Sequence, residues 1–356
     1  MAALEFLLGI AELASGRARV EVVAPESHFS YRPFAVAETF GAGPPYRLDL
    51  KRITSHVGAR RRLARVLSVN DTGHLVLATT GERLPYDLLV VACGARLEEA
   101  LPGALTFRGE QDEGAFRALL AELEAGSVTS VAFVVPPGAS WPLPLYELAM
   151  MTAAQLAQHG RAGIRLALVT PEARPLARFD GAASEAVAEL LDAAGIELHC
   201  GCYAAEVADG ELRLVPDGRL AAERVVTLPR LHGPHLAGLP SNPDGFLPTD
   251  LHGLVWGAQD VYAAGDATAF PVKQGGIAVQ QAEAVAEAIA ARLGAPVKPR
   301  PFRPLLRGLL LTGKDPRFLR ADPAGGRGET SIVTPYPPAR QRFRSRSSLQ
   351  LTTAGL

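Results

Sequence analysis

The sequence predicts an α/β fold in which helices and strands alternate along the chain. Three stretches support this prediction. Residues 2–24 read as a helix and then a strand, residues 130–202 repeat strand and helix, and residues 260–293 read as a short strand, a turn and a long Ala-rich helix. Alternation of this kind produces parallel strands, because right-handed crossovers return the chain to the same edge of a sheet.

The composition narrows the class of protein. The chain has 356 residues, 48% of them hydrophobic, which is enough for two or three packed domains. A formal net charge of −1 gives no general attraction to nucleic acid. Three cysteines form no disulfide framework, so we expect a reducing, cytoplasmic compartment. No apolar run is long enough to span a membrane, and Glu5 and Glu12 argue against a signal peptide.

The first helix is predicted over residues 2–15 and is followed by a strand over residues 19–24. Together they form half of a βαβ unit. A dinucleotide-binding fingerprint consists of a strand, the motif G-x-G-x-x-G or G-x-G-x-x-A, and a helix. In this chain Ala3 would take the last small position of the motif, and both essential glycines would lie ahead of Met1. Two explanations stay open: a start placed too late or a truncated chain, and a protein that has lost this phosphate cradle.

Residues 60–101 change to a β pattern, with N-D-T-G at residues 70–73 as a hairpin turn. The arginines at positions 60, 61, 62 and 65 are interpreted as a solvated face, with a phosphate contact as the alternative. An apolar strand then ends in Cys93 and Gly94. A cysteine on an apolar strand is most often simply buried, and redox chemistry is the weaker reading.

A second βαβ unit begins with a strand over residues 130–135. Its turn contains Pro136, Pro137 and Gly138, and Trp141 follows. Proline removes backbone N–H donors and tryptophan adds bulk where a pyrophosphate would need space, so we doubt NAD(P)H binding of the usual kind. Cys200 and Cys202 are expected on one face of a strand, where a disulfide between them would be strained. We expect no metal site.

The stretch 260–293 carries the strongest site signal. A buried strand ends at Gly265 and Asp266, and a long helix follows Gly275 and Gly276. Gly265 allows a ligand to approach the backbone, and Asp266 can accept hydrogen bonds from ligand hydroxyl groups. The alternative is an ordinary turn between a strand and a helix, for which Gly-Asp is a common pair.

Residues 260–293 contain, in order, A-A-G-D-A, K-Q-G-G, Q-Q-A and a long helix, and residues 86–94 read Y-D-L-L-V-V-A-C-G. Together these segments resemble the pyridine nucleotide-disulfide oxidoreductase superfamily, in its type II NADH dehydrogenase and sulfide:quinone oxidoreductase branch. The resemblance implies two Rossmann-like dinucleotide-binding domains. It implies an FAD domain from residues 1–100 and 226–295, split around an NAD(P)-like domain at 101–225. Residues 296–356 would form an interface segment and a disordered tail.

The resemblance also implies a function. FAD would pass electrons from an unidentified small-molecule donor to a quinone-like acceptor, with NAD(P)H doubtful as donor. The implied FAD contacts are Ala3, Glu26, Arg32, Gly94, Gly265, Asp266, Lys273, Gln274, Gly275 and Gly276, and Cys93 is a redox candidate. We expect no nucleic-acid partner. A homodimer stays open, as does peripheral contact with the inner face of the membrane through the apolar run near residues 301–313. The alternative is a non-catalytic relative that acts as a binding or scaffold module.

Overall fold

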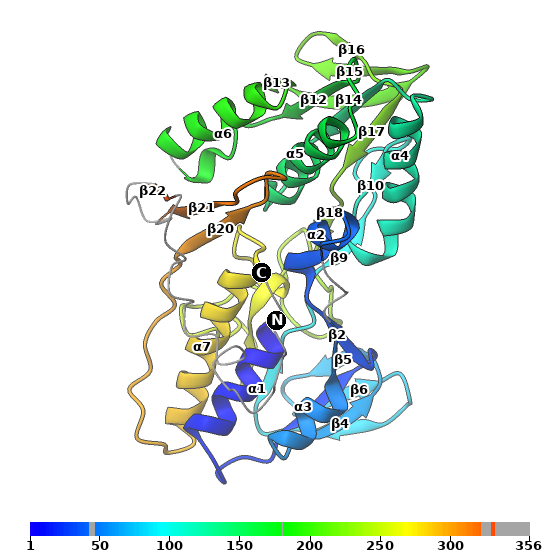
Figure 1. The fold of residues 1–356 in the computed structure, drawn as a ribbon. Coiled ribbons are helices and arrows are strands. Elements are labelled where there is room, and N and C mark those ends of the chain that lie inside the picture. The colour runs from blue at the N-terminus through cyan, green and yellow to red at the C-terminus, as the bar shows by residue number, and fades with distance from the viewer. Residues whose placement is uncertain (43–46, 180, 322–328, 332–356) are drawn as a thin grey trace.

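The structure is a computed structural model that describes residues 1–42, 47–179, 181–321 and 329–331. In Figure 1 one half of the molecule, in green, contains the middle of the chain, and the other half contains the blue N-terminal part and the yellow helix α7. Strands β9 (Arg96–Glu98) and β18 (Arg230–His232) pair antiparallel where the chain passes between the halves. We call the half that contains the middle of the chain the middle half, and the half that contains the N-terminal part and α7 the N-terminal half.

The middle half is built on one five-stranded sheet in which every pair is parallel. Its central strands are apolar and buried, with Phe133 and Leu168 fully covered. The sheet order is β10 (Leu105–Thr106), β17 (Arg224–Thr227), β11 (Ser130–Val134), β12 (Arg165–Thr170) and β13 (Ile196–Cys200). The helices α4 (Glu113–Ala125), α5 (Leu143–Gln158) and α6 (Gly181–Ala193) pack on it. An antiparallel sheet is formed by β14 (Tyr203–Ala208), β15 (Glu211–Val215) and β16 (Arg219–Ala221).

The N-terminal half contains two separate parallel pairs, β1 with β4 and β8 with β19. These strands are β1 (Glu21–Ala24), β4 (Arg60–Leu63), β8 (Leu89–Val91) and β19 (Val261–Ala263). Helices α1 (Ala2–Leu13) and α7 (Gly275–Arg292) lie side by side, as Figure 1 shows, and share one apolar cluster.

Smaller elements complete the N-terminal half. The predicted hairpin turn at residues 70–73 joins two strands of the antiparallel sheet β5 (Val66–Asn70), β6 (Leu75–Ala78) and β7 (Arg83–Pro85). Strands β2 (His28–Ser30) and β3 (Arg47–Asp49) pair, and α2 (Ala35–Thr39) and α3 (Leu50–His56) are short helices. Asp49 caps α3, because its carboxylate accepts from the backbone N–H of Lys51 at 2.7 Å.

The C-terminal apolar run, suggested as an interface or membrane-surface patch, is partly buried, and Leu309 is exposed. It forms β20 (Leu306–Leu310), which pairs with β21 (Arg317–Ala321) and, through it, with β22 (Glu329–Ser331). Leu306 and Leu310 are buried in the core of the middle half, because alternate residues of a strand face the same side. The tail from residue 335, predicted as disordered, lies outside the described residues.

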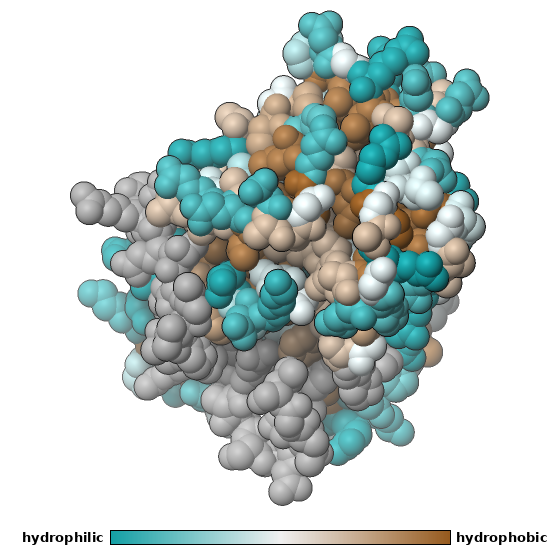
Figure 2. All heavy atoms as spheres, turned by 45° about the horizontal axis from the view of Figure 1, so that its top comes forward, coloured by the Kyte–Doolittle hydropathy of each residue, from teal (hydrophilic) through white to brown (hydrophobic). Residues whose placement is uncertain are grey.

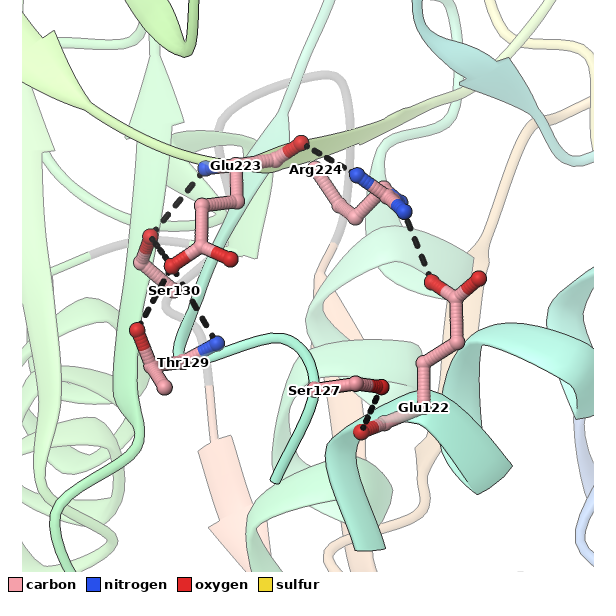
Figure 3. A network of polar contacts seen from close by, with 6 residues as sticks. All are labelled: Glu122, Ser127, Thr129, Ser130, Glu223 and Arg224. Carbon is pink, nitrogen blue, oxygen red and sulfur yellow. Dashed lines mark hydrogen bonds and ion pairs between the residues drawn. The ribbon is translucent and has the colours of Figure 1, made fainter. Parts of the chain in front are cut away.

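A polar network ties β11 to β17 at their amino ends (Figure 3). The Glu223 carboxylate accepts from the hydroxyl of Thr129 at 2.6 Å, and Arg224 pairs with Glu122 of α4 at 3.1 Å. Ligands of parallel sheets bind beyond the carboxyl ends of the strands, so this network serves the structure of the sheet. On the face shown in Figure 2, polar residues surround and separate the apolar residues that reach the surface.

Two local predictions are corrected. Strand β13 ends at Cys200, because Gly201 has φ of 70° and turns the chain, so Cys202 is not on the same strand. Both thiols are free. The residues Glu147-Leu148-Ala149 suggested the start of a helix, whereas helix α5 begins at Leu143, one turn earlier.

Candidate functional site

A cavity of about 2760 Å³ lies between the two halves. Its walls come from the amino ends of α1 and α7, the carboxyl ends of β1, β8 and β19, the β11–α5 turn and strand β20. Pockets for small ligands usually measure about 300 to 1,000 Å³, so this cavity has room for a dinucleotide-sized molecule.

The structure brings all the site residues predicted from the sequence to this one cavity. The lining includes Ala3, Glu26, Arg32, Cys93, Gly94, Gly265, Asp266, Lys273, Gln274, Gly275 and Gly276. They come from five separate parts of the sequence. Their roles as ligand contacts stay predictions.

The Gly265–Asp266 turn lies where α1 and α7 meet. Gly265 has φ of 76°, and a Cβ atom there would stand 3.0 Å from the Cβ of Ala2 and 3.4 Å from that of Ala278. Its backbone N–H donates to Oε1 of Gln281 at 2.8 Å. A larger residue would therefore force the helices apart, and glycine is needed for this close approach.

The amino ends of both helices face the cavity. In α1 the first backbone donors bonded to the Met1 carbonyl are those of Leu4 and Glu5, at 3.0 and 3.1 Å. The N–H groups of Ala2 and Ala3 precede them, and such groups carry the positive end of the helix dipole. Helix α7 begins at Gly275, and the Gln274 side chain caps it by accepting from the N–H of Ile277 at 3.0 Å.

Charged groups converge beside this turn. Burial raises the pKa of Asp266, while Lys273, Arg32 and the amino group of Met1 act in the opposite direction. Burial lowers the pKa of Lys273 to about 8, opposed by Asp266. The Lys273 ammonium donates to the carbonyl of Thr268 and lies 3.8 Å from the ring centroid of Phe246. Burial lowers the pKa of the Met1 amino group to about 6, so at neutral pH the site presents one carboxylate and the cations Arg32 and Lys273 to the same space.

Cys93 lies two residues after β8, and its side chain is exposed in the cavity rather than buried as its apolar strand predicted. The surrounding protein raises the pKa of its thiol, mainly by burial and also through the charge of Glu26. A raised pKa keeps the thiol protonated at neutral pH, which lowers its reactivity as a nucleophile. The other cysteines, Cys200 and Cys202, belong to the middle half. In the described part of the chain, no three His, Cys, Asp or Glu side chains are grouped as metal ligands.

Glu147 is a residue of the cavity whose chemistry the sequence reasoning missed. It is buried on α5, and its Oε1 accepts from the backbone N–H of Leu311 at 3.1 Å. Burial raises its pKa to about 8. The carboxyl group therefore holds a proton at neutral pH. A single acidic residue within the apolar helix sequence LPLYELAMM was the available signal.

Aromatic and polar side chains pack beside the β11–α5 turn, which itself lines the cavity. Trp141 packs edge to face on Phe179 with ring centroids 5.6 Å apart, and a Cβ on Gly308 of β20 would stand 3.1 Å from the Phe179 ring. At the end of β12, Glu172 accepts from the Tyr146 hydroxyl at 3.1 Å and from the N–H of Ala177 at 3.1 Å. The Glu172 carboxylate thus finds its hydrogen-bond partners within the protein at this end of the sheet.

Comparisons with known proteins agree with this architecture. The profile of the family described as "pyridine nucleotide-disulphide oxidoreductase" matches residues 1–289. Over 237 residues, 63% of this chain, the sequence is 31% identical to an NADH dehydrogenase-like protein of Mycobacterium tuberculosis strain H37Rv. The match spans 58% of the length of that relative.

Two solved structures share the fold. The sulfide:quinone oxidoreductase of Aquifex aeolicus superimposes with a TM-score of 0.84 at 19% identity, over 93% of this chain and 85% of that one. NDH2 of Plasmodium falciparum in complex with NADH gives a TM-score of 0.71 at 12% identity, over 91% and 88% of the two chains. The predicted α/β class of Rossmann-type oxidoreductases is thereby confirmed.

In the described residues no helix is both long and apolar enough to cross a membrane. The family profile covers most of the chain, from the first helix to residue 289 within α7, and includes every predicted site residue. The chain belongs to the pyridine nucleotide-disulphide oxidoreductase family.

Proposed function

We propose that this chain is an FAD-dependent oxidoreductase that passes electrons from a small-molecule donor through the flavin to a quinone-like acceptor. One observation carries the proposal: Asp266 follows Gly265 at the point where the amino ends of α1 and α7 reach the cavity. A carboxylate and two positive helix ends suit a ligand that has both hydroxyl and phosphate groups.

The residues present fit FAD on that side of the cavity. Asp266 would accept hydrogen bonds from ligand hydroxyl groups, and Arg32 and the helix ends would face phosphate charge. In the β11–α5 turn, which also lines the cavity but belongs to the middle half, the buried hydroxyl of Ser140 has no hydrogen-bond partner among the described residues and has bonding capacity for a ligand. When bound, FAD would supply the electron-transfer chemistry.

Glu147 adds a proton-holding group to this site. Its carboxyl group is protonated at neutral pH because burial disfavours the charge. Such a group can deliver or accept a proton at its oxygen as charge changes inside the cavity. Its hydrogen bond from Leu311 fixes Oε1 on the wall formed by α5 and the segment after β20.

The residues of the β11–α5 turn support a donor that is not held there as NAD(P)H is held in a glycine-rich turn. Pro136 and Pro137 offer no backbone N–H groups, and Trp141 occupies the adjoining space. The names of the similar proteins include NADH, sulfide and quinone. The donors to compare are therefore NADH, NADPH and sulfide, with a soluble quinone as acceptor. A quinone-like acceptor would bring the protein to a membrane surface as a peripheral protein.

The test is FAD titration of the purified full chain, followed by flavin fluorescence and visible absorption. Asp266→Asn should weaken binding by roughly 10- to 100-fold, since a hydrogen bond to a charged group contributes about 1.5 to 3 kcal/mol. Matched controls are Asp192→Asn on the exposed surface of α6 and Cys202→Ala, which should bind as the parent does. Unchanged FAD affinity in the Asp266 variant would exclude the assignment.

A scaffold or binding module is the second candidate. The observation that favours it is the division of the parallel sheet of the N-terminal half into two pairs, next to the place where FAD would bind. A chain that takes up no FAD at any concentration tested, while remaining folded by circular dichroism, would favour this candidate over the oxidoreductase.

A further inference from the structure

One short segment of the N-terminal part of the chain packs on the middle half. It consists of residues 30–40, which contain the end of β2, a single 3₁₀ turn at Arg32–Phe34 and helix α2. Val36 of α2 is buried in the apolar core of the middle half, and Phe40 packs edge to face on Phe116 of α4 with ring centroids 5.8 Å apart. We call this segment the Arg32 strap, and Figure 1 shows its helix α2, in blue, against the middle half.

The first end of the strap is held by a carboxylate of the middle half. Ser30 and Arg47 lie opposite one another in the β2–β3 pair, and Glu110, which precedes α4, contacts both. Its Oε2 accepts from the Ser30 hydroxyl at 3.2 Å, and its Oε1 forms an ion pair with the Arg47 guanidinium. One side chain of the middle half thus holds the cross-strand pair just ahead of Arg32.

The second end of the strap is held by an arginine of α4. The Arg117 guanidinium donates to the carbonyl of Glu38 at 3.0 Å and to that of Thr39 at 3.2 Å, at the end of α2. A cationic side chain there satisfies carbonyl groups that the end of a helix leaves without partners. Arg117 is itself paired with Glu113, one turn earlier on α4, at 2.7 Å. Residues 110–117 therefore hold both ends of the strap.

Between its two anchors the strap presents Arg32 to the cavity. The charge of Arg32 opposes the burial that raises the pKa of Asp266, and it adds to the burial that lowers the pKa of the Met1 amino group. The guanidinium is therefore near the Gly265–Asp266 turn and the start of α1. These groups belong to the N-terminal half, whereas the anchors of Arg32 belong to the middle half.

We propose that Glu110 and Arg117 are positioning residues for the cofactor. They fix the Arg32 guanidinium beside the Gly265–Asp266 turn, where it binds a phosphate group of FAD; this inference rests on the proposed function. Arginine binds phosphate through two parallel N–H groups, so its planar group has to be held in one orientation. The middle half thereby contributes to the binding of a cofactor whose other assigned contacts lie in the N-terminal half.

The experiment is a double-mutant cycle on the full chain, with FAD affinity measured by flavin fluorescence. Arg32→Met removes the guanidinium, and Arg117→Met removes the anchor at α2. The matched control is Arg224→Met, because Arg224 also pairs with a glutamate of α4 and donates to a backbone carbonyl, but within the middle half (Figure 3). Exposed ion pairs contribute little to stability, so all variants should remain folded.

Arg32→Met should weaken FAD binding roughly tenfold, since it removes hydrogen bonds to a charged group. Arg117→Met and Glu110→Gln should each weaken it roughly fivefold, and neither should weaken it further in the Arg32→Met background. Arg224→Met should bind as the parent does. Arg117→Lys should restore part of the affinity, because lysine keeps donors for the helix carbonyls. Equal losses with and without Arg32 would overturn the proposal, as would unchanged affinity in Arg32→Met.

Hydrogen exchange without FAD tests the anchors themselves. Peptides that cover residues 28–40 should exchange roughly threefold faster in Arg117→Met and Glu110→Gln than in Arg224→Met. Equal rates would show that residues 110–117 do not hold the strap. A parent that takes up no FAD would overturn the proposed function together with this inference, whereas a parent that binds FAD and shows additive anchor effects would overturn this inference alone.

Discussion

The two halves of the molecule use similar strand sequences in different surroundings. The middle half has five continuous parallel strands, and the side chains of β11 and β12 are buried except for the terminal Arg165. The N-terminal half has apolar strands of the same kind, VVA in β1 and LVV in β8, yet their valines and leucines are mostly half-buried. Apolar sequence makes a strand, but only neighbouring strands and helices bury it.

This difference between the two halves predicts that the middle half contributes mainly to stability and the N-terminal half mainly to ligand binding. In the middle half, Trp141, Phe179 and the Tyr146–Glu172 pair pack beyond the ends of β11 and β12, although the β11–α5 turn also lines the cavity. In the N-terminal half the corresponding strand ends open onto the large cavity. We therefore expect mutations in the middle half to reduce stability, and mutations at the strand ends of the N-terminal half to affect binding.

The largest effect is expected from a matched pair of leucines. Leu168→Ala in β12 should lower the free energy of unfolding by about 3 to 5 kcal/mol, because Leu168 is fully buried in a close-packed core. Leu89→Ala in β8 should cost about 1 to 2 kcal/mol, since Leu89 is only half-buried. Urea unfolding measures both values. Equal losses would show that the two sheets are equally well packed and would remove the contrast.

The next effect is a dependence of stability on pH. Glu147 has a pKa of about 8 in the folded protein and an ordinary value of 4.5 when unfolded. Between these values the unfolded state releases the proton and the folded state retains it, so stability falls by about 1.4 kcal/mol for each unit of rising pH. Below pH 4.5 both states are protonated and this loss is absent.

Glu147→Gln should remove this part of the pH dependence, because the amide does not ionise. Urea unfolding of parent and variant at pH 5 and at pH 7.5 measures it, with Glu185→Gln on the exposed surface of α6 as control. The Gln variant should gain stability relative to the parent as the pH rises. Parallel curves for parent and variant would show that Glu147 ionises normally.

The smallest effect is expected beyond the carboxyl end of β12 in the middle half. The Tyr146 hydroxyl donates to Glu172 at 3.1 Å and accepts from the N–H of Leu176 at 3.4 Å. Tyr146→Phe should cost about 1 to 2 kcal/mol, since it leaves buried polar groups without a partner. Tyr203→Phe is the control, because Tyr203 lies on the exposed side of β14. Thermal unfolding of both variants gives the comparison, and equal melting temperatures would contradict the assigned role of the hydroxyl.

Much of the fold was predictable from local signals. The helix over α1, the strand–turn–helix from β19 to α7 and the strand–helix alternation of the middle half all follow from apolar periodicity and glycine positions. The structure of the apolar run that forms β20 was harder to predict from the sequence. Its leucines suit a surface patch or a buried strand equally well, and only packing against the middle half distinguishes them.

The sequence by itself determined the class of fold, the family resemblance and the candidate residues around Gly265 and Asp266, because glycine conformation and apolar spacing act over a few residues. The tertiary structure decided the rest. It brought residues from five separated segments to one cavity and buried Glu147 enough to retain its proton. Within the described ranges it also left β1 and β8 each with one unpaired edge. Burial and strand pairing depend on contacts between residues far apart in the chain, and no local pattern records them.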